Sequence, residues 1–230
     1  MTPDVEQEET LVSLLILLTA GTGLVDAVCY IGLGHVFTAN MTGNLVLLGF
    51  ASAGTFGLSL TRSLTALAGF LIGALIGGRI AAKVAPIASS RWMSTAFSFE
   101  AILLLGGTLT AIGYRSKTGE ELRTYAIILL TALAMGVRNA TVRKLAVPDL
   151  TTTVLTLTVT GLAADSSLAG GTNPRWRRRI LSIVCMVTGA ALGALLVRHS
   201  LALALAAATC LTLCAVAARQ RARTVGDRVG

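Results

Sequence analysis

Residues 180–197 read ILSIVCMVTGAALGALLV and contain no charged side chain. An α-helix needs about 20 mostly apolar residues to cross the hydrocarbon core of a bilayer, so this run has the composition and nearly the length of a transmembrane helix. A second apolar run follows directly, at 200–218. Two such runs in succession predict a helical hairpin that spans a membrane.

The composition of the whole chain indicates the same class of protein. Of the 230 residues, 54% are hydrophobic and 13% are charged, and the mean hydropathy is +0.77. Soluble domains carry about a quarter charged residues, and disordered chains are polar and charge-rich. We therefore predict an all-α, polytopic helical membrane bundle.

Apolar runs that approach the spanning length give six predicted spans: 11–33, 63–84, 96–114, 122–140, 180–197 and 200–218. Two further segments, about 36–57 and 150–164, are rich in Thr, Asn or Gly and are predicted to be short or broken. We expect one transmembrane domain over residues 11–218, between an acidic tail at 1–10 and a basic tail at 219–230. Because residues 1–10 contain no Lys or Arg, we expect the first span to be kept as an anchor and not cleaved as a signal peptide.

The two halves of the domain, about 11–115 and 122–218, are predicted to be copies of each other. The matching landmarks lie about 113 to 116 residues apart, and internal repeats are usual in transporter folds. The matches are Gly23-Leu-Val-Asp-Ala27 with Gly136-Val-Arg-Asn-Ala140, Thr38 with Thr152, Thr42 with Thr156, and Gly73-Ala-Leu-Ile-Gly77 with Gly189-Ala-Ala-Leu-Gly193. Glycine faces let helices approach closely, so they predict tight contact between the copies or between subunits.

The 19 Lys and Arg residues favour one of two topologies. If all eight apolar segments cross, the basic residues are divided less unevenly between the two sides. If the two polar segments enter and leave on one side, the basic clusters at 79–91, 138–144, 175–179 and 219–228 all lie on the side of the N-terminus. The positive-inside rule favours this second arrangement, with three spans in each inverted half and both termini cytoplasmic. A broken but complete crossing near 40–44 is left open.

Candidate site residues begin with the polar stretch Thr38-Ala-Asn-Met-Thr-Gly-Asn44. Irregular backbone inside a membrane must be buried in protein or line a wet cavity. The candidates for a solute or ion path are Thr38, Asn40, Thr42, Gly43 and Asn44. The alternative is that these groups only cap a helix and hold helices together.

The second polar stretch is predicted to be a threonine ladder. Thr152, Thr156 and Thr160 share one face if this stretch is helical. Such a row of hydroxyls lines a path, or it only bonds back to the carbonyls of its own helix.

Ionisable side chains inside spans are expensive and usually face a cavity or a partner. Asp26 lies in the first span, and Arg138 lies at the equivalent depth of the repeated span, beside Asn139. We expect an ion pair between Asp26 and Arg138, either structural or coupled to transport. Glu100 is expected near a membrane interface.

Other classes of function are disfavoured by the sequence. The net charge of +8 comes from short basic clusters that flank apolar runs, which is typical of membrane topology and not of a nucleic-acid surface. The four cysteines lie in apolar runs without a CxxC spacing, so neither a metal nor a cofactor is expected. Motifs of metalloproteases, serine hydrolases and P-loop enzymes do not occur in the sequence, and we expect no enzymatic activity.

These motifs together resemble a known family. The segments 23–27, 36–37 and 42–45, then 134–140 and 147–149, are similar to the two signatures of the YoaK-like family, domain of unknown function 1275. The resemblance covers roughly residues 11–218 and implies a multi-pass protein of the bacterial inner membrane whose activity is not established. One departure is Leu157, where the repeat predicts a glycine.

The leading hypothesis is a transporter or channel for a small solute or ion, whose path lies where 38–44 meets 152–160. The alternative is a non-transporting scaffold or regulatory partner of another membrane complex, which the glycine faces favour. The expected partners are the lipid bilayer, the transported solute or ion, and a second copy of the chain.

Overall fold

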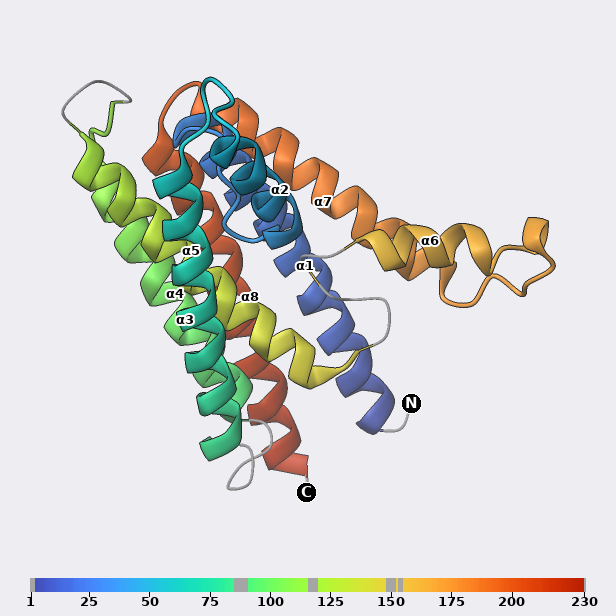
Figure 1. Cartoon of the computed structure of the whole chain (residues 1–230). Coiled ribbons are helices and arrows are strands. Elements are labelled where there is room, and N and C mark those ends of the chain that lie inside the picture. Colours follow the sequence, from blue (N-terminus) through green and yellow to red (C-terminus); the bar gives the residue numbers. More distant parts are fainter. Residues whose placement is uncertain (1–2, 85–90, 116–119, 148–151, 153–154, 230) are drawn as a thin grey trace.

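The computed structural model describes residues 3–84, 91–115, 120–147, 152 and 155–229. All regular secondary structure in this part of the chain is helical, which confirms the predicted fold class (Figure 1). The elements are α1 Pro3–Gly32, α2 Met41–Ser52, α3 Leu60–Val84, α4 Arg91–Thr110, α5 Glu121–Leu145, α6 Thr156–Ala164, the 3-10 helix η1 Ser167–Ala169, α7 Trp176–Val197 and α8 Leu201–Val229.

Six of these helices are long and apolar enough to cross a membrane, as the sequence predicts. They are α1, α3, α4, α5, α7 and α8. The two polar segments form the short helices α2 and α6, of 12 and 9 residues. At about 1.5 Å of rise per residue, neither reaches across the hydrocarbon core. The short helices therefore do not add spans.

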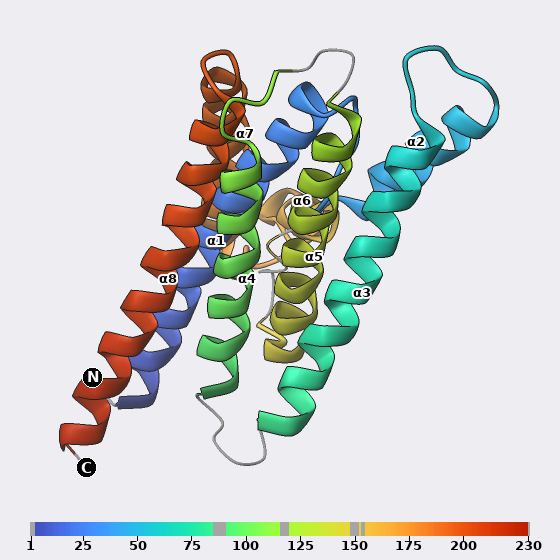
Figure 2. The same ribbon diagram turned by 90° about the vertical axis from the view of Figure 1, so that its left-hand side faces the viewer.

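The two halves of the chain are interlocked. In each half, the first span packs mainly on the third helix of the other half, so that α1 contacts α7 and α5 contacts α3. The last span of each half, α4 or α8, packs against the other (Figure 2). The short helices lie at the periphery, α2 on α3 and α6 on α7, and share no contact with each other. The contacts between the halves therefore involve all six long helices.

Glycines make the contacts between the halves close. A Cβ atom built on Gly73 would overlap the backbone carbonyl of Leu133 in α5, and one built on Gly189 would overlap that of Ala20 in α1. Gly136 and Gly23 complete the two contacts, because Cβ atoms there would overlap the carbonyls of Phe70 and Met186. The tight contact predicted from the glycine spacing is thus present, and it lies between the two halves.

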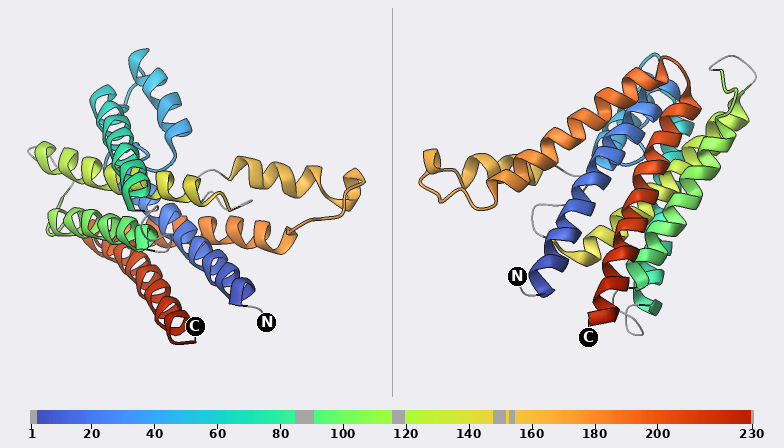
Figure 3. Two further views of the ribbon diagram at one scale, coloured as in Figure 1. Left: turned by 90° about the horizontal axis from the view of Figure 1, so that it is seen from below. Right: turned by 180° about the vertical axis from the view of Figure 1, so that it is seen from behind.

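Both termini lie at the same end of the bundle (Figures 2 and 3). Six crossings return the chain to the end where it started, as eight would, so the position of the termini is common to both predicted topologies. The outer faces of the long helices expose large apolar side chains such as Leu75, Leu105 and Leu192. In a membrane these faces contact lipid.

Candidate functional site

Asp26 organises the entry of α2. Its carboxylate accepts hydrogen bonds from three consecutive backbone amides, those of Thr38, Ala39 and Asn40, at 3.1, 2.9 and 3.1 Å. Buried backbone N–H groups need acceptors, and a carboxylate makes strong, charge-assisted ones. The carboxylate of Asp26 therefore holds the chain where it re-enters the bundle between α1 and α2.

The rest of the stretch 38–44 is also tied to protein groups. The Thr38 hydroxyl is buried 3.3 Å from Sγ of Cys29, which lies 3.6 Å from the hydroxyl of Thr131 in α5. Asn40 caps α2, because its side-chain oxygen accepts a hydrogen bond from the amide of Gly43 at 3.2 Å. The ring of Phe37 covers Gly43, where an added Cβ would lie 3.1 Å from it.

The last two candidates of this stretch differ from each other. Asn44 is buried and donates from Nδ2 to the carbonyl of Ser63 at 3.1 Å, whereas its Oδ1 has no partner among the described residues. Thr42 is exposed on the outer side of α2. Most polar groups of the first stretch therefore cap and anchor, which is the alternative that the sequence left open.

The predicted threonine ladder is wrong. Thr152 has a φ of 56°, a left-handed conformation that cannot continue a right-handed helix, and α6 begins only at Thr156. Thr156 and Thr160 are exposed, and Thr158 is the buried hydroxyl of α6. Thr152 is buried, and its hydroxyl has no partner among the described residues. Thr151 lies outside the described residues.

The second half therefore does not reproduce the first half closely. Asn139 occupies the position that matches Asp26, and its Nδ2 donates to the carbonyl of Met135 at 2.8 Å in its own helix. Arg179 of α7 donates to the carbonyl of Gly161 in α6 at 2.6 Å and pairs with Asp165 at 2.8 Å. Among the residues that the structure describes, α2 and α6 share no contact.

Arg138 pairs with Glu100, and the expected ion pair with Asp26 is wrong. Nη2 and Nε of Arg138 both donate to Oε1 of Glu100, the latter at 3.0 Å. Both side chains are completely buried, at 0% exposure. Arg138 is therefore not part of the basic flank of the membrane, where the charge distribution placed it, and Glu100 is not at an interface.

Helices of both halves complete this group. Nη1 of Arg138 donates to the carbonyl of Leu18 and to the hydroxyl of Thr22 in α1, both at 2.8 Å. Nη2 donates to the hydroxyl of Thr212 in α8 at 3.0 Å, and that hydroxyl donates to Oε1 of Glu100 at 3.1 Å. We call Thr22, Glu100, Arg138 and Thr212 the charge centre. It joins α1 and α4 of the first half to α5 and α8 of the second.

One atom of the charge centre makes no hydrogen bond to the described parts of the chain. Oε2 of Glu100 is buried and has no hydrogen-bond partner among the described residues. A buried carboxylate oxygen that makes no bond costs free energy, of the order of a few kcal/mol. Bare carboxylate oxygens of this kind accept protons, cations or the donor groups of a solute.

The sequence contained a signal for Glu100 that its interpretation undervalued. Glu100 is the sole acidic residue of the run 96–114. The run 96–114 predicts a position near the start of the span, but α4 begins at Arg91, so Glu100 lies near the middle of the helix. Thr22 and Thr212 carried no clear signal, because threonines in apolar helices usually bond back to their own carbonyls, as both of these also do.

The charge centre holds a single carboxylate among the side chains that commonly bind metals. Among the described residues, no group of three or more His, Cys, Asp or Glu side chains is placed to hold a metal ion. The chemistry that the charge centre offers is therefore hydrogen bonding and charge, from one guanidinium, one carboxylate and two hydroxyls.

Comparisons with known proteins cover most of the chain. The family model described as Protein of unknown function (DUF1275) matches residues 14–218. The chain belongs to the DUF1275 family. It is also 36% identical over 155 residues to the UPF0700 transmembrane protein YoaK of Bacillus subtilis (strain 168), an alignment that covers 67% of each chain. No solved structure matches.

Membership in the DUF1275 family confirms the resemblance seen in the sequence and supports a multi-pass membrane protein. Every residue of the charge centre lies within the matched range, as do Asp26 and the stretch 38–44. The description of the DUF1275 family assigns no activity. The chemistry of the charge centre therefore has to come from its geometry.

Replacing Asp26 by Asn is expected to loosen the entry of α2. Asn offers one acceptor oxygen in place of two and turns an N–H donor toward the amides of 38–40. We expect the free energy of local opening at 38–40 to fall by about 1–3 kcal/mol, which is the cost of leaving a buried group unpaired. Hydrogen exchange, read as mass increase of peptides that cover 38–40, should accelerate in Asp26→Asn and stay unchanged in the control Thr42→Ala. Unchanged exchange in both variants would contradict the capping role.

Proposed function

We propose that the protein is a transporter or channel for a small solute or ion, and that the charge centre is part of its path. The observation that carries this proposal is the buried Glu100–Arg138 pair, in which one carboxylate oxygen has no hydrogen-bond partner in the part of the chain that the structure describes. Taking two charges out of water is costly, and apolar side chains of similar volume often stabilise a protein equally well. An ion pair at this depth is by default a functional feature of a membrane protein.

The position of the charge centre between the two halves supports a movement of one half against the other. Its four side chains come from four helices, two in each half of the chain. A displacement of one half against the other breaks hydrogen bonds of Arg138 and opens the group toward one end. In transporters built from two inverted halves, such rocking about a central site gives alternating access.

The packing of the helices supports the two inverted halves. The neighbours of α1 and α5 correspond, since each packs on the third helix of the other half, and α4 and α8 pack on each other. Three spans in each half give the halves opposite orientations. We also propose that the protein lies in the bacterial inner membrane with both termini in the cytoplasm, because the six-span arrangement puts the basic clusters at 79–91, 175–179 and 219–228 on the side of the N-terminus.

Cysteine accessibility tests the proposal without knowledge of the solute. In a background whose four native cysteines are replaced, Thr22→Cys and Thr212→Cys are treated in membranes with a small charged methanethiosulfonate. We expect slow but complete labelling of both, because the charge centre must meet water in one state of a transport cycle. Leu192→Cys, on the outer face of α7, is the matched control and should not be labelled by this water-soluble reagent.

A second experiment measures flux through the reconstituted protein. Liposomes are loaded with a pH dye, and proton, K⁺, Na⁺ and Cl⁻ gradients are imposed in turn. Glu100→Gln keeps the size of the side chain and removes its charge, and we expect a loss of at least about tenfold in any flux that the unmodified protein shows. If Thr22 and Thr212 are never labelled and no gradient is dissipated, a non-transporting scaffold is the better reading.

A further inference from the structure

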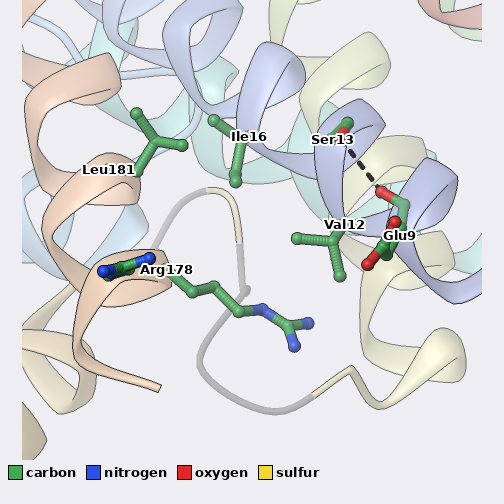
Figure 4. Close-up of a pocket in the computed structure, with 7 residues that line it drawn as sticks. Glu9, Val12, Ser13, Ile16, Arg178 and Leu181 are labelled. Carbon is green, nitrogen blue, oxygen red and sulfur yellow. Dashed lines mark hydrogen bonds between the residues drawn. The ribbon is translucent and has the colours of Figure 1, made fainter.

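A groove opens between the N-terminal parts of α1 and α7. It has a volume of about 550 Å³ and is lined by Glu9, Val12, Ser13, Ile16, Arg177, Arg178 and Leu181. Ile16 and Leu181 face each other from the two helices, and Arg178 lies on the α7 side below them (Figure 4). Apolar walls with cationic groups at one end match the shape of a phospholipid, whose tails are apolar and whose phosphate is anionic.

The groove lies where a lipid headgroup would be. Arg177 and Arg178 stand at the start of α7, in the arginine-rich segment that opens this span. Trp176 precedes them, is about half exposed, and has the guanidinium of Arg177 5.5 Å from its ring centroid. Tryptophan and arginine at the end of a span are typical of the membrane–water interface. Leu181, one turn further along α7, is 48% exposed and reaches toward the hydrocarbon.

The matching place between α5 and α3 is closed. By the spacing of the two halves, Val12 matches Tyr125, and Arg177 matches Thr61. The hydroxyls of Tyr125 and Thr61 are hydrogen-bonded at 2.7 Å and bridge the two helices. Where a tyrosine and a threonine bridge the helices on one side of the bundle, a valine and two arginines line the groove on the other. The groove is therefore a feature of this pair of helices and not a general consequence of the fold.

We propose that the groove between α1 and α7 binds one anionic phospholipid, with the phosphate against Arg177 and Arg178 and an acyl chain against Val12, Ile16 and Leu181. Basic pockets between transmembrane helices bind acidic headgroups in this way. Glu9 lies at the same end of the groove, is exposed, and disfavours an anion by repulsion. Removing the negative charge of Glu9 is therefore expected to strengthen binding of the lipid, whereas removing an arginine is expected to weaken it.

Native mass spectrometry of the purified protein in detergent tests the proposal. The probe is phosphatidylglycerol, added at increasing concentration, with phosphatidylcholine in a parallel series. We expect a single bound phosphatidylglycerol that survives gentle activation, and weaker binding of phosphatidylcholine. Arg177→Gln and Arg178→Gln should each weaken phosphatidylglycerol binding about fivefold, the effect of one basic group near an acidic headgroup. Glu9→Gln should strengthen it.

Two further variants separate the role of the tails from that of charge. Val12→Tyr introduces the residue found at the matching place, keeps both arginines, and should abolish the tight phosphatidylglycerol adduct. Arg79→Gln removes an exposed arginine of α3 that does not line the groove, and it should leave binding unchanged.

Three results would overturn the proposal. One is equal binding by the unmodified protein and by Arg177→Gln/Arg178→Gln, and another is a loss in Arg79→Gln as large as theirs. The third is displacement of the lipid by millimolar glycerol 3-phosphate, which has the headgroup charge but no tails and would indicate a site for a soluble anion.

Discussion

Arg138→Met is expected to lose about 3–5 kcal/mol of stability, which is the cost of breaking a buried ion pair from one side. The substitution leaves the carboxylate of Glu100 at 0% exposure without its guanidinium, and it also frees the hydroxyls of Thr22 and Thr212 from their bonds to Arg138. The measurement is the thermal unfolding midpoint in mild detergent, followed by the loss of the monodisperse peak in size-exclusion chromatography.

The double variant Glu100→Leu/Arg138→Met separates stability from function. Because both charges are gone, we expect most of the stability to return, since well-packed apolar residues often replace a buried ion pair without loss. In this double variant, we expect Thr22→Cys to stay unlabelled and the flux of the unmodified protein to stay absent. If Arg138→Met is as stable as the unmodified protein, the pair is not held as the structure shows. If flux survives in the double variant, the charge centre is not part of the path.

The second large effect is expected at the glycines between the halves. Gly73→Ala places a methyl group on the carbonyl of Leu133, and Gly189→Ala places one on that of Ala20, so that in each case two helix backbones must separate. Overpacking typically costs about 1–3 kcal/mol and sometimes more. We expect a clear fall of the unfolding midpoint in each variant, and a roughly additive fall when both are combined, because the two contacts join different pairs of helices and share no residue.

Gly78→Ala is the matched control for this prediction. Gly78 lies in the same helix as Gly73, and a Cβ built on it meets no atom within 4 Å. Alanine is the better helix former by about 1 kcal/mol, so this variant should be neutral or more stable. If Gly73→Ala and Gly78→Ala behave alike, the close contact of α3 with α5 is not what the structure indicates.

The apolar pattern was enough to predict the architecture. Lengths of apolar runs gave the six spans, because a bilayer imposes one minimum length on every crossing helix. The glycine spacing at 73–77 and 189–193 predicts a tight contact between the halves or between subunits, and the structure has it between the halves. These properties are local in the sequence, so no knowledge of distant neighbours was needed to read them.

The candidate site was predicted less well, because its geometry depends on long-range neighbours. Asp26 and Arg138 were both recognised as costly, but the sequence does not tell which partner lies opposite each. Asp26 binds backbone amides of the segment that follows its own helix, and Arg138 binds a carboxylate 38 positions away. The predicted threonine ladder is wrong for a local reason, because the backbone of Thr152 is left-handed. A threonine at this position does not indicate such a conformation.

The interlocked packing has a consequence for how the protein is made. The glycine face of α1 is complete as soon as this helix leaves the ribosome, but its partner α7 is nearly the last segment to be synthesised. Contacts of high sequence separation form slowly, since the intervening chain must first be closed into a loop. The α4–α5 hairpin, which holds Glu100 and Arg138, can assemble earlier. A nascent chain truncated before α7 would therefore hold a paired charge in a bundle that is still open along α1, and quality control in the membrane would meet it in that state.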